Sequence, residues 1–308
     1  MRIAVTGGAG FIGSNLVKKL VNFGHNVTVV DDLSTGLQSN LFGVDCDFHR
    51  LSIENFSKLR KILSSAEAIF HFAARGSVPR SILDPLATYK INLAGTLNVL
   101  EISRENGAHI IYSSSSSVYG SNSLQPKIEE TWTSPLSPYA ASKSSAESFL
   151  TAYANSYKIP ITNFRFFNVY GPFQRPDHAY AAVIPKWIWL AMNGGVIEVY
   201  GDGSQTRDFT FIDNVTAVAV KSLSRVSSNA DPINLAYGNS VSLNQILSKL
   251  QSIFPLLRVE YLSLRKGDVR HSQNNPKKLF QYFSEPEAVD FDQGFDLTYQ
   301  WLKSAYSK

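Results

Sequence analysis

The sequence predicts an α/β protein, with a doubly wound parallel sheet followed by a smaller C-terminal α/β region. Three observations lead to this prediction. Short apolar segments alternate with amphipathic helical segments through residues 1–165, an alternation typical of parallel sheets. A glycine-rich turn follows the first apolar segment, and runs of small or hydroxyl-bearing residues follow later ones. All lie at the carboxyl ends of predicted strands, where open α/β sheets bind their ligands.

The chain opens with an apolar strand, residues 3–5, followed by the glycine-rich turn 6–13 and an amphipathic helix. Such glycines allow a tight turn and let the backbone approach a pyrophosphate, which then lies at the positive end of the helix. The dinucleotide fingerprint is satisfied by Gly8, Gly10 and Gly13, and its threefold-spaced variant by Gly7, Gly10 and Gly13. The turn therefore predicts a dinucleotide site; a glycine turn without a ligand is the alternative.

The second predicted strand, residues 26–30, ends in Asp31 and Asp32. An acidic residue about 20 positions after the glycines binds the adenosine ribose hydroxyls and disfavours a 2′-phosphate. Asp31 therefore favours NAD over NADP, and Asp32 is either a second contact or a solvated neighbour.

Two further predicted strands, residues 48–51 and 68–72, bring more groups to the same edge of the sheet. Ser52 and Ile53 end the first of them. The small residues after the second would let a flat cofactor lie close to the backbone. His71 lies there too, and we expect it to be structural.

An apolar strand at 109–112 leads into the serine run 113–117, and Tyr139 and Lys143 follow, four residues apart. On a helix this spacing places both side chains on one face. A lysine ammonium beside a phenol lowers the phenol pKa, and such a tyrosine can act as general base and then as acid. Taken alone, the spacing of Tyr139 and Lys143 also fits a pair of side chains on a surface helix. The serine run alone also fits a polar loop. The glycine-rich opening of the chain favours the catalytic interpretation.

The regular alternation stops after the predicted strand 161–166. Segment 213–236 has the pattern of a helix, with Asp213 as N-cap, and then a strand that returns to the sheet. We therefore expect an NAD-binding domain over 1–165 with 213–236, and a substrate domain over 166–212 and 237–308. The guanidinium groups of Arg207, Arg265 and Arg270 suit a diphosphate, although each arginine could equally form a surface ion pair.

Composition excludes several other classes of protein. The 29 Lys and Arg exceed the 25 Asp and Glu by a net charge of +4, and their scatter argues against nucleic-acid binding. With Cys46 as the single cysteine, no intrachain disulfide forms and a cysteine-based metal site is disfavoured. The chain shows neither a signal peptide nor an apolar run of membrane length, so we expect a cytoplasmic protein. Apolar stripes on the long helices fit the core, or the face of a homodimer.

Together these motifs resemble the extended short-chain dehydrogenase/reductase family, and within it the UDP-sugar 4-epimerases, over nearly the whole chain. The resemblance is carried by residues 6–13, Asp31 to Gly36, His71 to Ala74, Asn92 with Gly95 and Thr96, Ser113 to Ser115 before Val118-Tyr119-Gly120, Tyr139 with Lys143, Asn168 to Pro172, and Arg207 to Phe209. It implies a Rossmann-type fold, NAD as cofactor, and a UDP-sugar as substrate.

The resemblance also implies residue roles. Ser115 would hydrogen-bond the sugar 4-hydroxyl, Tyr139 would take its proton, and Lys143 would hold the nicotinamide ribose. The implied cofactor contacts are Gly7, Gly10, Phe11, Ile12, Gly13, Asp31, Asp32, Leu33, Ser34, Thr35, Gly36, Ser52, Ile53, Phe72, Ala73, Ala74, Asn92, Ser113, Tyr139, Lys143 and Phe167. The implied substrate contacts are Ser77, Val78, Ser115, Asn168, Val183, Val199, Tyr200, Arg207, Arg265, Asp268 and Ser272.

The implied reaction is inversion at C4 through a transient 4-keto sugar that turns over about its diphosphate linkage, with no net redox change. Dehydratases of this family carry acids at the positions of Ser116 and Ser117, and decarboxylases carry a glutamate at the position of Ser117. A hydroxyl does not replace a carboxylate in acid–base chemistry at C5 or C6. A nucleotide-sugar reductase or dehydrogenase that uses NAD or NADP, a dehydratase of the same fold, and a non-catalytic NAD-binding protein remain as alternatives.

Three positions depart from the family pattern. Ser52 replaces the usual adenine-binding aspartate, which Asp47 would supply in a shifted register. Ala182 stands where some epimerases have asparagine. Ser272 aligns with a pocket-wall position that is a bulky tyrosine in enzymes restricted to plain hexoses, so a small side chain here predicts room for a 2-acetamido group.

Overall fold

The computed structural model describes residues 1–178, 180–224, 229–263, 270–284 and 288–306. The chain forms two compact units. Unit 1 comprises residues 1–122, 129–166 and 216–235, and unit 2 comprises residues 123–128, 167–215 and 236–308.

Unit 1 is built on a seven-stranded sheet in which every pairing is parallel. In spatial order the strands are β11 (Pro232–Leu235), β6 (Ile161–Phe166), β5 (His109–Ser115), β4 (Ala68–His71), β1 (Arg2–Thr6), β2 (Asn26–Asp31) and β3 (Asp47–Arg50). The direction of strand order reverses between β1 and β4, which is where doubly wound sheets open a ligand crevice at their carboxyl ends. The predicted fold class is confirmed.

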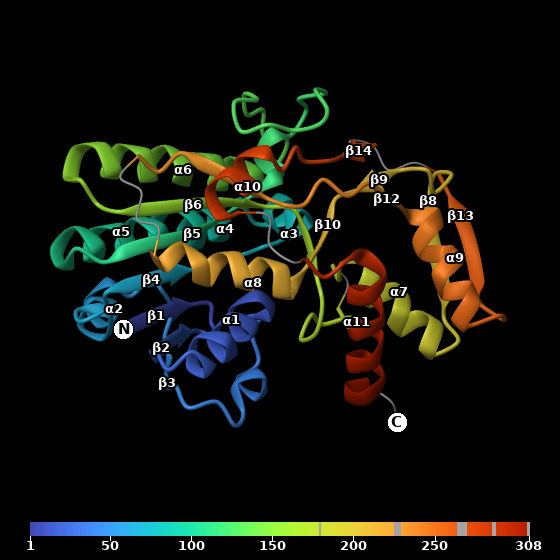
Figure 1. Cartoon of the computed structure of the whole chain (residues 1–308), viewed down its shortest axis with the longest axis horizontal. Helices are drawn as coiled ribbons and strands as arrows, with labels where there is room; N and C mark the ends of the chain where they lie inside the picture. Colours follow the sequence, from blue (N-terminus) through green and yellow to red (C-terminus); the bar gives the residue numbers. More distant parts are fainter. Residues whose placement is uncertain (179, 225–228, 264–269, 285–287, 307–308) are drawn as a thin grey trace. The chain divides into compact units, whose positions relative to one another are not determined.

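Helices cover both faces of this sheet, and Figure 1 shows α5 and α6 on the side of the strands opposite α1. The helical elements of unit 1 are α1 (Phe11–Asn22), η1 (Gln38–Leu41), α2 (Phe56–Leu63), α3 (Val78–Leu83), α4 (Pro85–Tyr89), η2 (Lys90–Ala94), α5 (Gly95–Asn106), η3 (Ser116–Tyr119), α6 (Pro138–Tyr157) and η4 (Ser222–Ser224), and α8 (Ile212–Lys221) runs from unit 2 into unit 1. Apolar residues of α2, α5 and α6 share one core with the strands.

Residues 85–106 do not form one regular helix. They comprise α4, the π-helical turn η2 and α5. A Cβ atom on Gly95 would come within 2.5 Å of the Ile53 side chain, so the start of α5 packs directly against the segment that follows β3. Helix α6 begins where Ser137 accepts a hydrogen bond from the Ala140 amide at 3.2 Å, with a proline at the first helical position.

Within its described residues, unit 2 contains three small sheets and four helices of its own. The sheets pair β7 (Asn168–Tyr170) with β10 (Phe209–Phe211), β9 (Thr206–Arg207) with β12 (Val241–Ser242) and β14 (His271–Ser272), and β8 (Val196–Tyr200) with β13 (Arg258–Leu262). The helices are α7 (Val183–Met192), α9 (Leu243–Ile253), α10 (Lys277–Phe283) and α11 (Phe291–Tyr306). Helix α8 begins at Ile212, so Asp213 lies in its first turn and the prediction of an N-cap at Asp213 was wrong.

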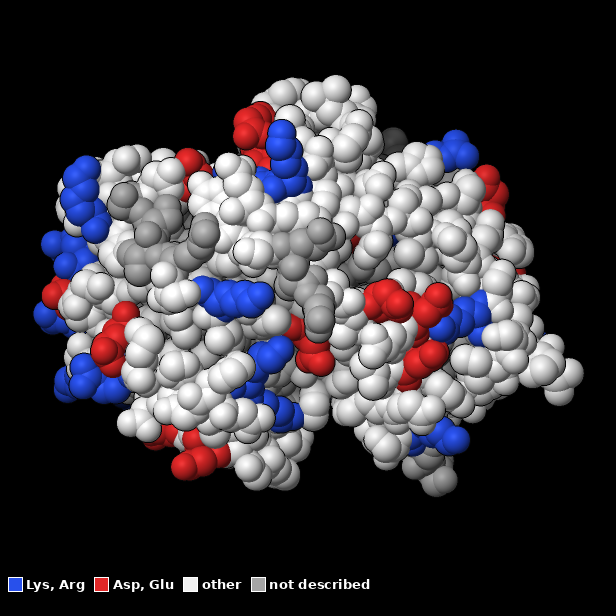
Figure 2. Space-filling view, viewed as in Figure 1, with Lys and Arg blue, Asp and Glu red and all other residues white. Residues whose placement is uncertain are grey.

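Charged side chains of both signs are interspersed over the face shown in Figure 2. None of the helices within the described ranges combines the length and apolar character needed to span a membrane. The same ranges contain no cluster of three or more His, Cys, Asp or Glu side chains that could hold a metal ion.

Candidate active site

The glycine-rich turn forms a tight cradle between β1 and α1. Gly7 has φ +73°, and a Cβ atom there would lie 2.6 Å from the Ala73 amide nitrogen. A Cβ atom on Gly13 would overlap the carbonyl oxygen of Gly7. Gly10 caps α1 without a side-chain hydrogen bond, and the first turn carries no acidic residue. The positive amino end of the helix, with Phe11 and Ile12 in its first turn, is thus suited to an anion.

Asp31 ends β2 beside this turn. Its Oδ2 accepts from the Ala9 amide at 3.0 Å and its Oδ1 accepts from the Leu33 amide at 2.8 Å. Burial raises the carboxyl pKa, and these backbone hydrogen bonds oppose the rise. The carboxylate is therefore held in place at the carboxyl end of β2. Each of its two oxygens keeps a second lone pair that can accept a hydrogen bond from a ribose hydroxyl.

The loop after Asp31 folds onto the glycine-rich turn, since the Leu37 amide donates to the Ala9 carbonyl at 3.0 Å. Asp32 closes a turn within the loop by accepting from the Ser34 amide at 2.8 Å. A Cβ atom on Gly36 would lie 2.9 Å from the Ala9 carbonyl carbon. Asp32, Leu33, Ser34, Thr35 and Gly36 are thus brought together beside the cradle.

The end of β3 offers a hydroxyl in place of a carboxylate. The Ser52 hydroxyl accepts from the Glu54 amide at 3.2 Å, and Ile53 is buried against Gly95. Asp47 pairs with Thr28 whereas Arg50 pairs with Asp31, which places Asp47 at the amino end of the strand. The idea that Asp47 replaces the missing aspartate was therefore wrong, because parallel strands bring ligands only to their carboxyl ends.

The segment after β4 packs on the end of β1. The Phe72 amide donates to the Thr6 carbonyl at 3.1 Å, and the Ala73 amide donates to the Thr6 hydroxyl at 3.4 Å. Ala74 follows directly, with a partly exposed side chain. The small side chains of Ala73 and Ala74 leave the backbone near Gly7 open to a flat ligand.

His71 is a structural residue, as expected. Its Nδ1 lies 2.7 Å from the Thr6 hydroxyl and its Nε2 lies 2.9 Å from the Thr96 hydroxyl. The Thr96 proton is donated to the Asn92 carbonyl, so Nε2 of His71 must be the donor and Nδ1 the acceptor. Burial, assisted by the charge of Lys143, lowers the histidine pKa to about 3. The ring is therefore neutral near neutral pH.

Asn92 links the loop after β4 to helix α6. Its Oδ1 accepts from the Arg75 amide at 2.7 Å, and its Nδ2 donates to the Ser142 hydroxyl at 3.0 Å. Ser142 directly precedes Lys143.

Ser77 caps α3 by accepting from the Arg80 amide at 3.3 Å, and Val78, 38% exposed, begins that helix.

Ser115, Tyr139 and Lys143 come together at the end of β5. The Ser115 hydroxyl lies close enough to the Tyr139 phenol to affect its pKa. Lys143 Nζ donates to the Ser113 carbonyl oxygen at 2.6 Å and lies 4.7 Å from the centroid of the Tyr112 ring. Burial lowers the Lys143 pKa to about 7, against an opposing contribution from Glu147.

The tyrosine pKa differs from the expectation. Burial raises the pKa of Tyr139, and the Ser115 hydroxyl opposes this rise. The predicted lowering by Lys143 was wrong for this arrangement, because the ammonium donates to the Ser113 carbonyl and rests on the Tyr112 ring. The group that favours the phenolate here is the Ser115 hydroxyl.

The other serines of the run support this site. Ser117 donates to the Ser115 oxygen twice, from its amide at 3.2 Å and from its hydroxyl at 2.9 Å. The Ser113 hydroxyl donates to the His71 carbonyl at 3.2 Å. Sequence reasoning missed Glu147, which accepts from the Ser114 hydroxyl. Its position four residues after Lys143, on the same helix face, was the available signal.

Unit 2 contains most of the predicted substrate contacts. Arg207 and Ser272 are register partners on β9 and β14, and Arg207 Nη1 donates to the carbonyl oxygens of Thr206 at 2.9 Å and Arg270 at 3.2 Å. The backbone N–H of Asn168 donates to the backbone carbonyl oxygen of Asp208 at 3.3 Å. Arg265 and Asp268 lie outside the described residues.

The remaining unit 2 predictions concern mostly hydrophobic side chains. Val199 on β8 is completely buried, so it offers no side-chain surface to a ligand. The Tyr200 hydroxyl donates to Glu198 at 3.1 Å. Phe167 is 4% exposed, and Val183 begins α7 after Ala182, which provides no side-chain cap.

The parallel sheet, the glycine cradle and the serine–tyrosine–lysine cluster define an enzyme of the extended short-chain dehydrogenase/reductase class that uses NAD. Residues 3–236 match the NAD dependent epimerase/dehydratase family, and the chain belongs to that family.

Relatives and solved structures of similar sequence agree with this assignment. A UDP-glucuronate 4-epimerase of Thermodesulfobacterium geofontis is 34% identical over 97% of this chain and 95% of its own. The structure of a UDP-glucose 4-epimerase of Thermotoga maritima with UDP-glucose has a TM-score of 0.94, 34% identity and full coverage of both chains. A UDP-N-acetylglucosamine 4-epimerase of Methanobrevibacter ruminantium has a TM-score of 0.91, 34% identity and 98% coverage of each chain. The matches also include UDP-glucuronic acid decarboxylases and nucleotide-sugar dehydratases.

Proposed function

We propose that this chain interconverts the C4 epimers of a UDP-hexose through a transient 4-keto sugar. The observation that carries this proposal is the environment of Ser115 and Tyr139. The Ser115 hydroxyl favours the ionised phenol, and the neighbouring acid–base position is Ser117, whose hydroxyl donates to the Ser115 hydroxyl oxygen at 2.9 Å. The site therefore supplies one proton-transferring group suited to a hydroxyl, and no carboxylate at Ser117 for elimination or decarboxylation.

The residues would divide the work as follows. Tyr139 takes the proton from the 4-hydroxyl and returns it after the sugar has presented its other face. Ser115 hydrogen-bonds the phenol and so stabilises the charged form that accepts the proton. Lys143, held by the Ser113 carbonyl, places a positive charge beside the reacting groups. Bound NAD supplies the hydride acceptor for oxidation at C4 and the donor for the reverse step.

All of the proposed cofactor contacts except Phe167 belong to unit 1. The cradle of Gly7, Gly10 and Gly13 fits a pyrophosphate, since a Cβ atom at the first or last of these would collide with neighbouring backbone. Asp31 would bind the adenosine ribose. Asn92 would keep the loop after β4 and helix α6 in place around the nicotinamide side.

Groups in unit 2 would bind the nucleotide. The guanidinium of Arg207 suits a diphosphate, and Asn168, Tyr200, Arg265 and Asp268 would complete the recognition of UDP. Ser272 has a small, partly exposed side chain, which supports acceptance of N-acetylated hexoses alongside or in place of plain ones.

A homodimer is also proposed, on the basis of an apolar surface in unit 1. Helices α3, α4 and α6 contact one another, and they expose large apolar side chains, among them Leu83 and Leu86 at 75% and 71%. Such a patch on one side of a unit marks a protein interface. Analytical ultracentrifugation of the protein should give twice the mass of one chain. The Leu86→Asp variant should give the mass of one chain.

The experiment that tests the proposed reaction uses purified protein and a panel of UDP-glucose, UDP-galactose, UDP-N-acetylglucosamine and UDP-glucuronate without added NAD. The C4 configuration of the products is read by proton NMR. Epimer formation without net change at the NADH absorbance band supports the proposal. A reductase or dehydrogenase would instead consume cofactor in proportion to product, and either that result or the absence of turnover on every sugar would reject it.

A further inference from the structure

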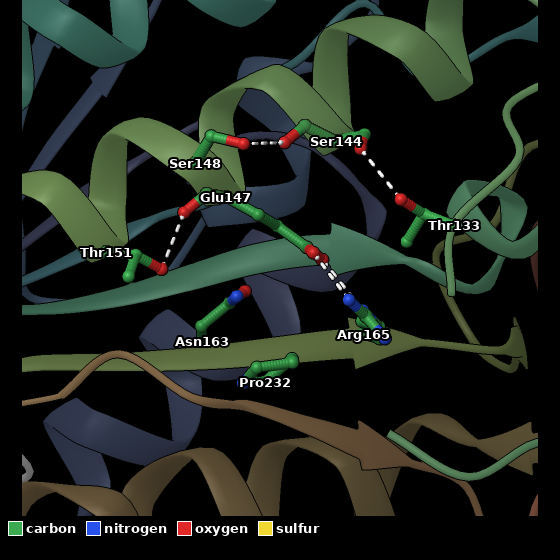
Figure 3. A pocket seen from close by; sticks show the side chains of 8 residues that line it. All are labelled: Thr133, Ser144, Glu147, Ser148, Thr151, Asn163, Arg165 and Pro232. Atoms are coloured by element: carbon green, nitrogen blue, oxygen red, sulfur yellow. Dashed lines mark hydrogen bonds and ion pairs between the residues drawn. The ribbon is translucent and has the colours of Figure 1, made fainter. Parts of the chain in front are cut away.

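A buried ion pair joins helix α6 to strand β6 next to the catalytic strand. Glu147 Oε1 accepts from Arg165 Nε at 2.9 Å, and Oε2 accepts from Nη2 at 2.7 Å. The two side chains are 10% and 6% exposed. Figure 3 shows the carboxylate and the guanidinium facing each other between helix and strand, and both groups border a cavity of about 190 Å³. The pairing is bidentate, which fixes the orientation of both groups.

This pair also holds the strand that carries the catalytic serine. Glu147 Oε1 accepts a hydrogen bond from the Ser114 hydroxyl, directly before Ser115. On the other side, Arg165 Nη1 donates to the Tyr119 hydroxyl at 2.9 Å, and Tyr119 ends the short helical turn η3 that follows Ser115. The ion pair therefore restrains the chain immediately before and shortly after the catalytic hydroxyl.

Glu147 acts on Lys143 through its charge as well. The two residues are one helical turn apart on α6, and the carboxylate raises the lysine pKa against the effect of burial. The other titratable groups around the ammonium are Tyr112 on β5, His71 on β4 and Tyr139 on α6. The histidine is neutral, and burial raises the pKa of both phenols. Within the described part of the chain, Glu147 is thus the anion that favours the charged lysine.

We propose that Glu147 is a positioning residue that fixes the end of β5 through Ser114 and supplies a negative charge one helical turn from Lys143. Its effect on turnover rests on the proposed epimerisation, but its effect on the lysine does not. The charge and the hydrogen bonds can be separated, because glutamine keeps the shape and an oxygen acceptor while removing the charge.

The decisive measurement is the titration of Lys143, followed by the NMR signal of its ¹³C-labelled Cε atom and assigned by its loss in Lys143→Arg. In Glu147→Gln the midpoint should fall by about one pH unit, since the anion is removed and the Arg165 cation remains. Glu147→Asp should restore most of the shift. Glu101→Gln is the matched control, because Glu101 is paired with Arg104 on helix α5 away from the lysine, and it should leave the midpoint unchanged.

A folded Glu147→Gln protein with an unchanged Lys143 midpoint would overturn the inference. A general loss of stability would not imitate the predicted result, because it lowers the melting temperature without moving the midpoint in the folded state. Should the unpaired guanidinium prevent folding, the double variant Glu147→Gln/Arg165→Met is compared with Arg165→Met, because these two proteins differ only in the Glu147 carboxylate. The Lys143 midpoint should then be lower in the double variant, and equal midpoints would overturn the inference.

Turnover provides the second readout. The alkaline limb of the kcat profile should move to lower pH in Glu147→Gln by the same amount as the lysine midpoint. Failure of the wild-type protein to epimerise any UDP-hexose would reject the proposed function while the lysine titration still decides the role of Glu147.

Discussion

The Nζ atom of Lys143 donates to the carbonyl oxygen of Ser113 at 2.6 Å, and this hydrogen bond ties helix α6 to the end of strand β5. The same helix presents Tyr139 one turn earlier, and the same strand presents Ser115 two residues later. The proposed catalytic groups therefore come from two elements that are joined at the site itself. A substitution at the phenol should change chemistry without loosening this joint.

We expect Tyr139→Phe to lose about 10² to 10⁴ of kcat, the range typical of a missing general acid–base group. The melting temperature and the amount of bound NAD should stay close to wild type, because the lysine–serine hydrogen bond remains. Tyr153→Phe is the control, since its hydroxyl lies on the same helix but donates to Glu101. Near-normal turnover of Tyr139→Phe would remove the phenol from the mechanism.

Two substitutions in the glycine cradle should have different effects, one on stability and the other on NAD binding. Gly13→Ala should lower the melting temperature, because the new Cβ atom would collide with backbone atoms of Gly7 and Gly8. Gly10→Ala meets only the Gly7 carbonyl oxygen, at 3.2 Å, so its fold should survive while NAD binding weakens.

Thermal unfolding with and without NAD separates the two effects, and Gly76→Ala, with open space around its Cβ position, is the control. Equal NAD affinity for Gly10→Ala and wild type would show that the cofactor does not approach this turn.

The buried, neutral His71 should make the folded protein less stable at acidic pH. Its folded pKa is about 3, against 6.5 for the ordinary side chain, so between these values the unfolded chain binds a proton that the folded chain does not. Stability from this group is full above about pH 6.5 and falls by about 1.4 kcal/mol per pH unit down to about pH 3. His71→Gln should flatten this slope in denaturant titrations. The same slope in both proteins would mean that His71 is not held neutral.

Ser272 predicts sugar selectivity. A tyrosine at this position would fill the space that a 2-acetamido group needs, so Ser272→Tyr should reduce kcat/KM for UDP-N-acetylglucosamine at least about tenfold. Turnover of UDP-glucose should change little and serves as the internal control. Unchanged N-acetyl turnover in a folded variant would place the selectivity elsewhere.

Much of the fold could be predicted because it depends on local patterns. The apolar segments, the glycine spacing and the acid after the second strand all mark the parallel sheet and its carboxyl edge. The register of β3 could not be predicted, and it excludes Asp47. The π-helical turn η2 between α4 and α5 was not predicted either.

The site could be predicted only as far as its residue types. Tyr139 and Lys143 follow from spacing, but the direction of the Tyr139 pKa depends on burial and on where the Lys143 ammonium points. Glu147 on helix α6 was overlooked because only its helical spacing from Lys143 indicated it, and its partner Arg165 lies on strand β6, 18 residues away. Long-range pairs of this kind are not encoded in any local pattern.

In the proposed reaction one hydrogen leaves C4 and the same hydrogen returns to the opposite face. The most direct measurement uses a UDP-hexose deuterated at C4. This substrate is incubated in ordinary water with the purified protein, without added NAD. Mass and NMR spectra of the epimerised product should show the deuterium retained at C4. Replacement of the deuterium by solvent hydrogen, at a rate equal to epimer formation, would contradict the account.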